Sequence, residues 1–492
     1  FNFKKCVSNS NCTQFVLPSL FSLSMPLDEG GYDYGIKNRE IAFMEILKNE
    51  GYSTLIFSNC NQMGADNGYE RGATENVNSF DYRLILEQKL NRVILSKYKK
   101  NFDKKNRDDE LLEDYKDLIV KIKNKIENVD TLLWNKKLKK INFSIKNNII
   151  NEIQLLKKNP EIVKKRLLKI NPASAWLFLG DEKLNSFKFY IKRLASAINW
   201  RFKHKISKSS LPFTLLGHKT INITDNFNKF KDKINNLKKP YFIYHHVMDL
   251  HDYENLNSIS YLIKKLLNYP TWLKNTLNMH RKRKFFYDST LMIVDTYIGK
   301  ILKILDSNTI LFITSDHGHR KSLKKQFKRS YITNDYFNEM HGEDIEVPFI
   351  SNTNLNEKIN NENHLYDTIS VSKKIFSTLN INLDNYLENK NDNKKFIISE
   401  HAGRGAFNLN KDLYFTLSNF KFRMIISFIN NELFVKFYDL IQDPDEINDI
   451  SNDKNFENTV NEMFNYLKEN RYDIIKLKLK NLKKINNNLI QV

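Results

Sequence analysis

A short apolar stretch that ends abruptly in an acidic and an imidazole side chain constrains the fold more than any other feature of the sequence. Thr309–Thr314 reads TILFIT and is followed at once by Ser315-Asp316-His317-Gly318. An apolar run of this length between polar segments is typical of a buried strand. Open α/β sheets bind ligands beyond the carboxyl ends of parallel strands, so we expect Asp316 and His317 to emerge at such an edge. The alternative is a turn or a helix N-cap, because Asp-x-Gly suits both.

Three histidines gather within seven residues at the end of a second predicted strand, Tyr241–Met248. The segment reads His245-His246-Val247-Met248-Asp249-Leu250-His251, in a chain with 11 His in all. His246, Asp249 and His251 could converge on an anion or a metal ion. His341-Gly342-Glu343, just before the predicted strand Val347–Ile350, is a further candidate.

The periodicity of apolar residues predicts an α/β protein. Residues 1–79 contain helical spacing over Arg39–Glu50, a stop at Gly51 and an apolar strand over Ser53–Ser58, which together make an α/β unit. The α/β pattern resumes over residues 236–385, with an amphipathic helix over Phe286–Leu305.

The remaining segments differ in composition. Residues 80–235 are rich in Lys, Leu and Ile and poor in Gly, and we interpret them as a mostly helical insertion. Its helical spacing lies over four stretches, Tyr82–Tyr98, Asp108–Asn128, Ile145–Lys157 and Phe187–Phe202. Lys411–Tyr438 alternates in the β manner, which predicts a small antiparallel sheet within a C-terminal subdomain over residues 386–454. Residues 455–492 predict a basic helical tail.

The chain is basic, with 78 Lys and Arg against 57 Asp and Glu, a net charge of +21. The Lys residues are spread along most of the sequence instead of being concentrated with aromatic residues, so we interpret the excess as a solvated basic surface and expect no nucleic-acid partner. An acidic polymer or an anionic membrane surface stays open as a partner. No apolar run reaches the ~18 residues of a membrane span. The three Cys residues exclude a disulfide framework.

Taken in order, the motifs resemble the sulfatase family of the alkaline phosphatase superfamily over nearly the whole chain outside the insertion. The match rests on short segments that each resemble a family pattern, and their succession along the chain is the specific signal. They are Leu17-Pro18-Ser19 with Gly30-Gly31, the helix–Gly–strand unit Ala42–Ser58, Tyr69-Glu70-Arg71-Gly72, His246-x-Met248-Asp249-x-His251, Tyr287-Asp288 through Ile298-Gly299, Thr314-Ser315-Asp316-His317-Gly318, His341-Gly342 with Val347-Pro348, and Tyr438-Asp439-Leu440 with Asp443-Pro444-x-Glu446.

The resemblance implies an alkaline-phosphatase-like fold, in which a mixed, mainly parallel sheet lies between helices and a small antiparallel subdomain follows. It implies transfer of a sulfuryl or phosphoryl group with the help of a divalent cation, Ca²⁺ by preference and Mn²⁺ or Zn²⁺ as alternatives. By this likeness Asp316 and His317 would hold the metal. His246 and His341 would act in catalysis, by contacting the anionic group or protonating the leaving oxygen. His251 and Asp249 would orient substrate or neighbouring groups, and Arg404 would pair with an anionic substrate or serve a structural pair.

Two features depart from the family pattern. The family nucleophile stands two residues before the Pro, where this chain has Val16, which cannot attack an ester. Cys12, Thr13 and Ser19 are the nucleophilic side chains nearby, and we expect Thr13 to act; Cys12 lacks the sequence context for formylglycine. Phe1 lies 17 residues before Pro18, so we also expect the family's first strand and its metal-binding Asp residues to be missing from this chain, as in a fragment.

Three functions follow from the resemblance. The first is a sulfatase-like hydrolase that cleaves a sulfate ester, with an anionic polysaccharide as a candidate substrate. The second is a transferase that moves phosphoethanolamine or phosphoglycerol on a surface glycan. The third is a non-catalytic member that binds an anionic glycan. The sequence leaves a bacterial cytoplasm and a cell envelope open as the compartment.

Overall fold

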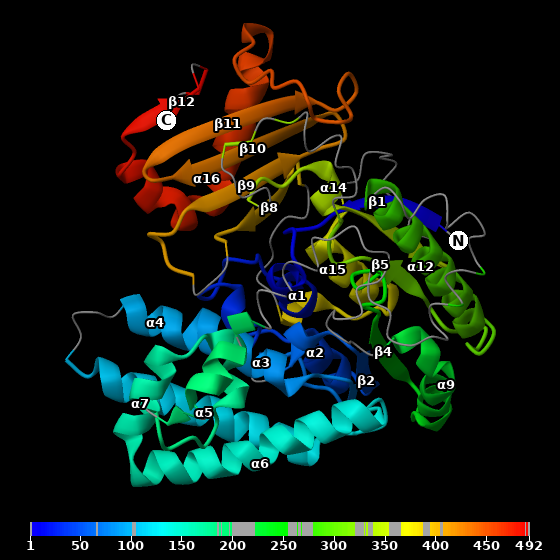
Figure 1. Cartoon of the computed structure of the whole chain (residues 1–492). Helices are drawn as coiled ribbons and strands as arrows, with labels where there is room; N and C mark the ends of the chain where they lie inside the picture. Colours follow the sequence, from blue (N-terminus) through cyan, green and yellow to red (C-terminus); the bar gives the residue numbers. More distant parts are fainter. Residues whose placement is uncertain are drawn as a thin grey trace. The chain divides into compact units, whose positions relative to one another are not determined.

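The computed structural model divides the chain into two compact units (Figure 1). Unit 1 comprises Phe1–Ile46 and Asn308–Val492, and unit 2 comprises Leu47–Ser307. The structure describes residues 2–490 except 65–66, 101–104, 185, 188, 196, 199–221, 254–262, 264–266, 268–278, 320–328, 330, 333–337, 354–365, 387–393, 404–406 and 488. None of the helices in these ranges combines the length and the apolar character that a membrane span requires.

Unit 1 contains a mixed four-stranded sheet in the order β5-β6-β1-β7. These strands are Phe312–Thr314, Glu346–Ser351, Asn2–Val7 and Tyr366–Asp367. β1 runs parallel to β7 but antiparallel to β6, and β6 is also antiparallel to β5. β5, the strand before Asp316, therefore runs in the same direction as β1 and β7, as expected, and β6 between β5 and β1 is the reversed strand. Helices α1 (Thr13–Ser22), α14 (Gly342–Ile345) and α15 (Thr368–Thr378) belong to the same unit.

The second sheet of unit 1 has the order β12-β11-β10-β9-β8 and is antiparallel except for the β11–β12 pair. Its strands are β8 (Ile397–His401), β9 (Leu413–Ser418), β10 (Phe422–Ile429), β11 (Glu432–Asp439) and β12 (Lys484–Asn486). The β10–β11 hairpin turns at Asn430 and Asn431, whose φ angles of 52° and 65° suit a tight turn that matches strand twist. The antiparallel C-terminal sheet expected from the sequence is confirmed.

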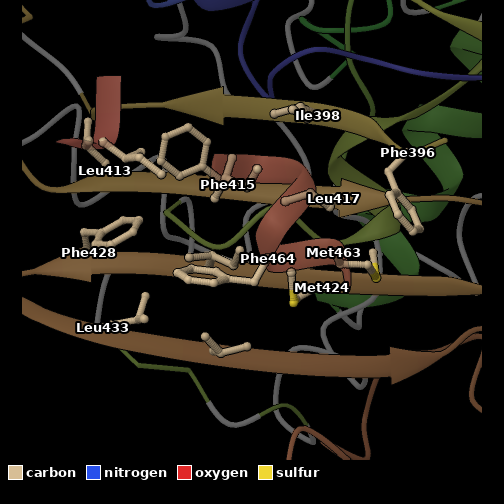
Figure 2. Close-up of a cluster of buried hydrophobic side chains, with 14 of the residues drawn as sticks. Phe396, Ile398, Leu413, Phe415, Leu417, Met424, Phe428, Leu433, Met463 and Phe464 are labelled. Atoms are coloured by element: carbon tan, nitrogen blue, oxygen red, sulfur yellow. The ribbon is translucent and has the colours of Figure 1, made fainter. Parts of the chain in front are cut away.

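Helix α16 (Glu457–Lys480) packs on one face of this sheet and supplies part of its core (Figure 2). Met463 and Phe464 lie against the buried faces of β8, β9 and β10, where Phe415, Met424 and Phe428 are completely buried. Since β12 follows α16 and pairs with β11, residues 455–492 take part in the same core as the sheet.

Unit 2 is built on a parallel three-stranded sheet in the order β3-β2-β4. The strands are Glu75–Asn78, Ser53–Ser58 and Tyr241–His246, and the last two confirm strands predicted from the sequence. Its core joins Phe57 of β2 to Phe230 of α9 (Phe227–Asn236) and Tyr297 of α12 (Met279–Leu302).

A helical region follows β3 in unit 2. It comprises α3 (Tyr82–Lys89), a π-helical turn (Leu90–Ile94), α4 (Leu95–Lys100), α5 (Arg107–Asn128), α6 (Lys136–Lys158) and α7 (Pro160–Lys169). The helices predicted over residues 82–157 are thus confirmed. Short 3-10 helices occur elsewhere in the chain at Tyr32–Tyr34, Asn61–Met63, Pro172–Leu177, Ile223–Asn226, Leu383–Asn385 and Lys454–Phe456, and α2 spans Phe43–Asn49.

Candidate functional site

Thr13 and His317 are two predicted site residues of unit 1 that lie far apart in the sequence and come into contact in the fold. Thr13 is the first residue of α1, and its N-cap Cys12 has extended backbone angles. The hydroxyl of Thr13 lies 3.2 Å from Nε2 of His317, which follows β5. The side chain of Thr13 is buried, with 3% of its surface exposed. A hydroxyl and an imidazole nitrogen at this distance have the geometry of a nucleophile and its base.

The contact of the second ring nitrogen, Nδ1, shows which nitrogen of His317 carries the proton. Nδ1 lies 2.6 Å from the main-chain carbonyl oxygen of Gly318, which can only accept a hydrogen bond. The proton is therefore assigned to Nδ1, and Nε2 is left with a lone pair that faces the Thr13 hydroxyl. In this tautomer His317 can accept the proton of Thr13.

Asp316 lies beside this pair, and its carboxylate orients the main chain of the same loop. Its Oδ1 accepts a hydrogen bond of 2.9 Å from the main-chain N–H of His317, and its Oδ2 lies 3.7 Å from Nε2 of that residue. Within the part of the chain that the structure describes, no group of three or more His, Cys, Asp and Glu side chains is arranged to hold a metal ion. One carboxylate and one imidazole do not fit a divalent cation by themselves, since Zn²⁺ takes about four ligands and Ca²⁺ about six to eight.

Gly318 allows the loop after β5 to pack tightly. Its N–H donates to the carbonyl oxygen of Asp344, at 2.7 Å. A Cβ atom at Gly318 would lie 2.2 Å from the carbonyl oxygen of Glu343. The backbone of α14 therefore fixes the position of the loop that carries His317, and only glycine fits there.

The segment between β1 and α1, residues 8–12, places Thr13 and is itself held by buried polar contacts. Ser8 donates from its hydroxyl to the main-chain oxygen of Asp316, at 2.5 Å, which ties the loops of Thr13 and His317 together. The side chain of Asn9 donates to Asp367, at 3.1 Å, and to the carbonyl oxygen of Ile398, at 3.0 Å. Its own Oδ1 accepts from the N–H of Ile369. Asn9 therefore joins this segment to the start of α15 and to β8.

Sequence reasoning missed Ser8, Asn9 and Asp367. The signal available was the polar run Ser8-Asn9-Ser10 after the apolar pair Cys6-Val7. The sequence analysis predicted no strand there, because two lysines interrupt the apolar pattern of β1. Without that strand, nothing indicated that the polar run would be buried.

His341 lies in a buried cluster of charged side chains in unit 1. It is fully buried, and its Nδ1 lies 2.6 Å from Glu446 and its Nε2 3.7 Å from Glu339. Glu446 also contacts Arg423, which lies 2.6 Å from Glu346. Burial opposes ionisation of Glu446, but the charges of Arg423 and His341 hold the pKa of its carboxyl well below the usual range.

From the sequence, Glu446 was identified only as a member of a motif, and no role was predicted for its carboxylate. Its place in the Asp443-Pro444-x-Glu446 segment was the signal that could have pointed to it. His341 stays a predicted catalytic residue, and its described contacts are with carboxylates.

The predicted residues His246, Asp249 and His251 belong to unit 2. Nδ1 of His246 lies 2.8 Å from the hydroxyl of Tyr244, and the largely exposed His251 contacts the neighbouring Asp252 at 3.0 Å. Asp249 is buried and accepts hydrogen bonds from the N–H of Ile223 and the hydroxyl of Thr224.

Burial shifts the pKa values of two groups in this segment. It raises the pKa of Asp249 to about 6, against hydrogen bonds from the 3-10 helix Ile223–Asn226 that lower the pKa. It lowers the pKa of His245 to about 4. His245 is held between the carbonyl oxygen of Phe57 and the hydroxyl of Tyr297, so it is a core residue of unit 2.

The other predicted positions are less informative. Arg404 lies outside the described residues. Val16 and Ser19 are fully buried within α1, and Cys12 is partly exposed at its N-cap.

No curated protein matches the sequence. Among solved structures, a phosphonate monoester hydrolase of Agrobacterium radiobacter is similar with 11% identity and a TM-score of 0.47, covering 97% of this chain and 88% of that chain.

Two further structures are similar at comparable levels. BT1596, a 2-O GAG sulfatase, has 14% identity and a TM-score of 0.43, with coverage of 97% of this chain and 85% of that chain. BT4656, solved with its substrate D-glucosamine-2-N,6-O-disulfate, has 12% identity and a TM-score of 0.43, with coverage of 96% and 90%. At TM-scores below 0.5, no conclusion about this chain rests on these similarities.

The family model gives the assignment. Residues 181–381, the segment that contains His246, His317 and His341, match the model described as Sulfatase. The resemblance inferred from the ordered motifs is thereby confirmed over these residues, where the chain is similar to the sulfatase family.

Proposed function

We propose that the chain is a hydrolase of sulfate esters on an anionic glycan, with Thr13 as nucleophile and His317 as its base. The observation that carries this proposal is the 3.2 Å contact between the Thr13 hydroxyl and Nε2 of His317. The position of Thr13 adds support, since the N-terminus of the ten-residue helix α1 favours negative charge. An alkaline-phosphatase-like fold is part of the proposal.

The reaction can be written with the groups of the chain. Nε2 of His317 takes the hydroxyl proton of Thr13 while Oγ1 bonds to the sulfur and the ester S–O bond breaks. The departing alkoxide takes a proton from an acid, for which His341 is the candidate within unit 1. His246, in unit 2, stays a predicted catalytic residue. Water then attacks the sulfated threonine, releases hydrogen sulfate and restores the hydroxyl.

The family resemblance implies a divalent cation, and Asp316 and His317 stay its proposed ligands, with Ca²⁺ preferred over Mn²⁺ and Zn²⁺. With the proton on Nδ1, His317 would bind the cation through Nε2, so it would act as the base of Thr13 only while the cation is not bound to that nitrogen. These two side chains are fewer than any of these cations takes, so the steps above use only groups of this chain. Asp249, His251 and Arg404 stay proposed substrate contacts.

The test uses the purified chain with p-nitrophenyl sulfate and p-nitrophenyl phosphate. We expect turnover of the sulfate ester, a loss of at least ~10³-fold in T13A, and a loss of ~10²–10⁴-fold in H317A. The matched control is T378A, because the hydroxyl of Thr378 only donates to the carbonyl oxygen of Lys374 within α15. Full activity in T13A would exclude Thr13 as nucleophile.

The identity of the nucleophile also supports the second candidate, a phosphoethanolamine or phosphoglycerol transferase, because such relatives often use Thr. The same assay separates the two. Preference for the phosphate ester, together with a phosphorylated instead of a sulfated Thr13 peptide in mass spectrometry, would favour the transferase. No covalent adduct and no turnover of either ester would favour the non-catalytic alternative.

A further inference from the structure

An exposed apolar stripe lies on a helical segment of unit 2. The backbone is helical at residues 187, 189–195 and 197–198. Five large apolar side chains of this segment are exposed, namely Phe187 (81%), Tyr190 (53%), Ile191 (49%), Leu194 (62%) and Ile198 (56%). We call these five residues the apolar stripe. Among the described residues they form the densest run of exposed large hydrophobic side chains in the sequence.

The spacing of the stripe places its members on one side of the helix. Successive members are three, one, three and four residues apart, which is the pattern of a single helical face. The opposite side makes the contacts with unit 2. Phe189 is buried against Phe178, with ring centroids 5.1 Å apart, and Lys192 pairs with Asp181 at 2.7 Å.

This orientation is the reverse of an ordinary surface helix, which buries its apolar face. Single exposed apolar residues are normal on protein surfaces, but a contiguous row of five marks an interaction surface. Aromatic and aliphatic side chains together, as in Phe187, Tyr190 and Leu194, are typical of helices that lie in a membrane interface.

The charge around the stripe indicates which partner it fits. Between Glu182 and Asp225 the sequence has no acidic residue and nine basic ones. The chain as a whole has 57 acidic residues in 492, so about five would be expected in a stretch of this length. Lys183 and Arg193, in the described part of this stretch, are exposed. A stretch of sequence that combines an apolar helical face with basic and no acidic residues is complementary to a surface that is anionic and apolar at once.

We propose that residues 187–198 dock this protein on an anionic lipid bilayer. The apolar stripe enters the boundary between headgroups and acyl chains, and Lys183 and Arg193 face the lipid phosphates. An apolar protein groove would satisfy the stripe but would not account for the absence of acidic residues over 183–224. The inference is independent of the proposed chemistry at Thr13.

The experiment is vesicle flotation of the full chain. Vesicles of phosphatidylcholine with phosphatidylglycerol are compared with vesicles of phosphatidylcholine alone, at low and at high salt. We expect binding to the anionic vesicles that weakens with salt. The double variant I191N/L194N should bind on the order of 10²-fold more weakly, and R193E should bind more weakly as well.

The matched control is F420N/I441N, because both side chains are exposed in unit 1, at 44% and 66%. It should bind like the unaltered chain, and circular dichroism should show equal helix content in all variants. The proposal is overturned if the chain does not float with anionic vesicles, if it floats equally well with neutral ones, or if I191N/L194N floats undiminished. Concentration-dependent dimerisation that I191N/L194N abolishes, without vesicle binding, would assign the stripe to a second copy of the chain.

Discussion

The buried carboxylate of Asp367 supports the segment that places Thr13, so replacing it by asparagine tests the architecture of unit 1. Asp367 is the N-cap of α15 and accepts from the N–H of Ser370, at 2.8 Å. Nζ of Lys394 lies 2.7 Å from each of its oxygens, and Asn9 donates to Oδ2. The variant D367N keeps the shape of the side chain but removes its charge.

The expected loss of stability follows from the pKa of the group. Burial alone would raise this pKa, but Lys394 and the hydrogen bonds from Ser370 and Asn9 lower it to about 2, from an ordinary value of 3.8. A depression of this size corresponds to about 2 kcal/mol of folding free energy at neutral pH. Because D367N also leaves the ammonium of Lys394 without its counter-charge, we expect a total loss of about 2–4 kcal/mol.

The pH dependence has a defined sign. Since the folded pKa lies below the unfolded one, the ionised carboxylate stabilises unit 1 fully above about pH 5, and this contribution is lost as the pH falls through 4 towards 2. The difference between the unaltered chain and D367N should therefore shrink over that window. The double variant D367N/K394M should recover part of the loss, because it removes the unpaired charge.

Hydrogen exchange is the suitable assay, because it reports locally. The four Trp residues all lie in unit 2, so their fluorescence does not follow unit 1. Exchange of peptides from α15, measured by mass spectrometry in increasing urea, gives the free energy of opening of this element. D384N is the control, since Asp384 is exposed. A loss below ~0.5 kcal/mol in D367N, or a loss that does not change between pH 7 and pH 2.5, would refute the reasoning.

Two further predictions concern the neighbouring loop and the other unit. G318A should destabilise the loop that carries His317 by about 1–3 kcal/mol, because the added Cβ would lie 2.2 Å from the carbonyl oxygen of Glu343. Hydrogen exchange of peptides over 312–319 should become faster. G299A is the control and should leave this exchange unchanged, because the space around Gly299 is open. D249N should stabilise unit 2 at pH 7 by about 1–3 kcal/mol, because burial raises the pKa of Asp249 to about 6 and the folded state therefore disfavours its charge. The free energy of unfolding of unit 2 in the unaltered chain should rise as the pH falls from 6 to 4, and the difference from D249N should vanish near pH 4. Urea unfolding followed by Trp fluorescence measures the stability of both chains. A D249N chain that is less stable than the unaltered chain at pH 7 would contradict the argument.

The sequence allowed the strands and helices with clear apolar periodicity to be predicted. β2 and β4, α5 and α6, and the hairpins of the C-terminal sheet lie where their apolar patterns indicated. β1 was missed because Lys4 and Lys5 interrupt its apolar pattern, and its pairing with β6 and β7 is a long-range property that local propensity does not contain. The reversed direction of β6, between β5 and β1, was not predictable for the same reason, since strand direction depends on which partner the strand finds.

Within the candidate site, the motifs identified individual residues but not their neighbours. Asp316 and His317 were predicted from the end of a strand, and the structure brings His317 to Thr13. The contact of His341 with Glu446 was not predictable, because Glu446 is 105 residues away from it in the sequence. Contacts of this kind depend on the folded topology, so they cannot be predicted from residue type and spacing alone.

The start of α1 gives a physical reason to prefer Thr13 over the position that the family pattern favours. Val16 lies three residues further along α1, which is one turn deeper on nearly the same side of the helix, and it is fully buried. A nucleophile at position 16 would therefore need an α1 that begins about one turn later. Since the helix begins at Thr13, its first turn brings a hydroxyl to the unprotonated nitrogen of His317, and Val16 can serve as a core residue. A valine at the position where the resemblance would place the nucleophile is thus compatible with the proposed hydroxyl–imidazole pair one turn earlier.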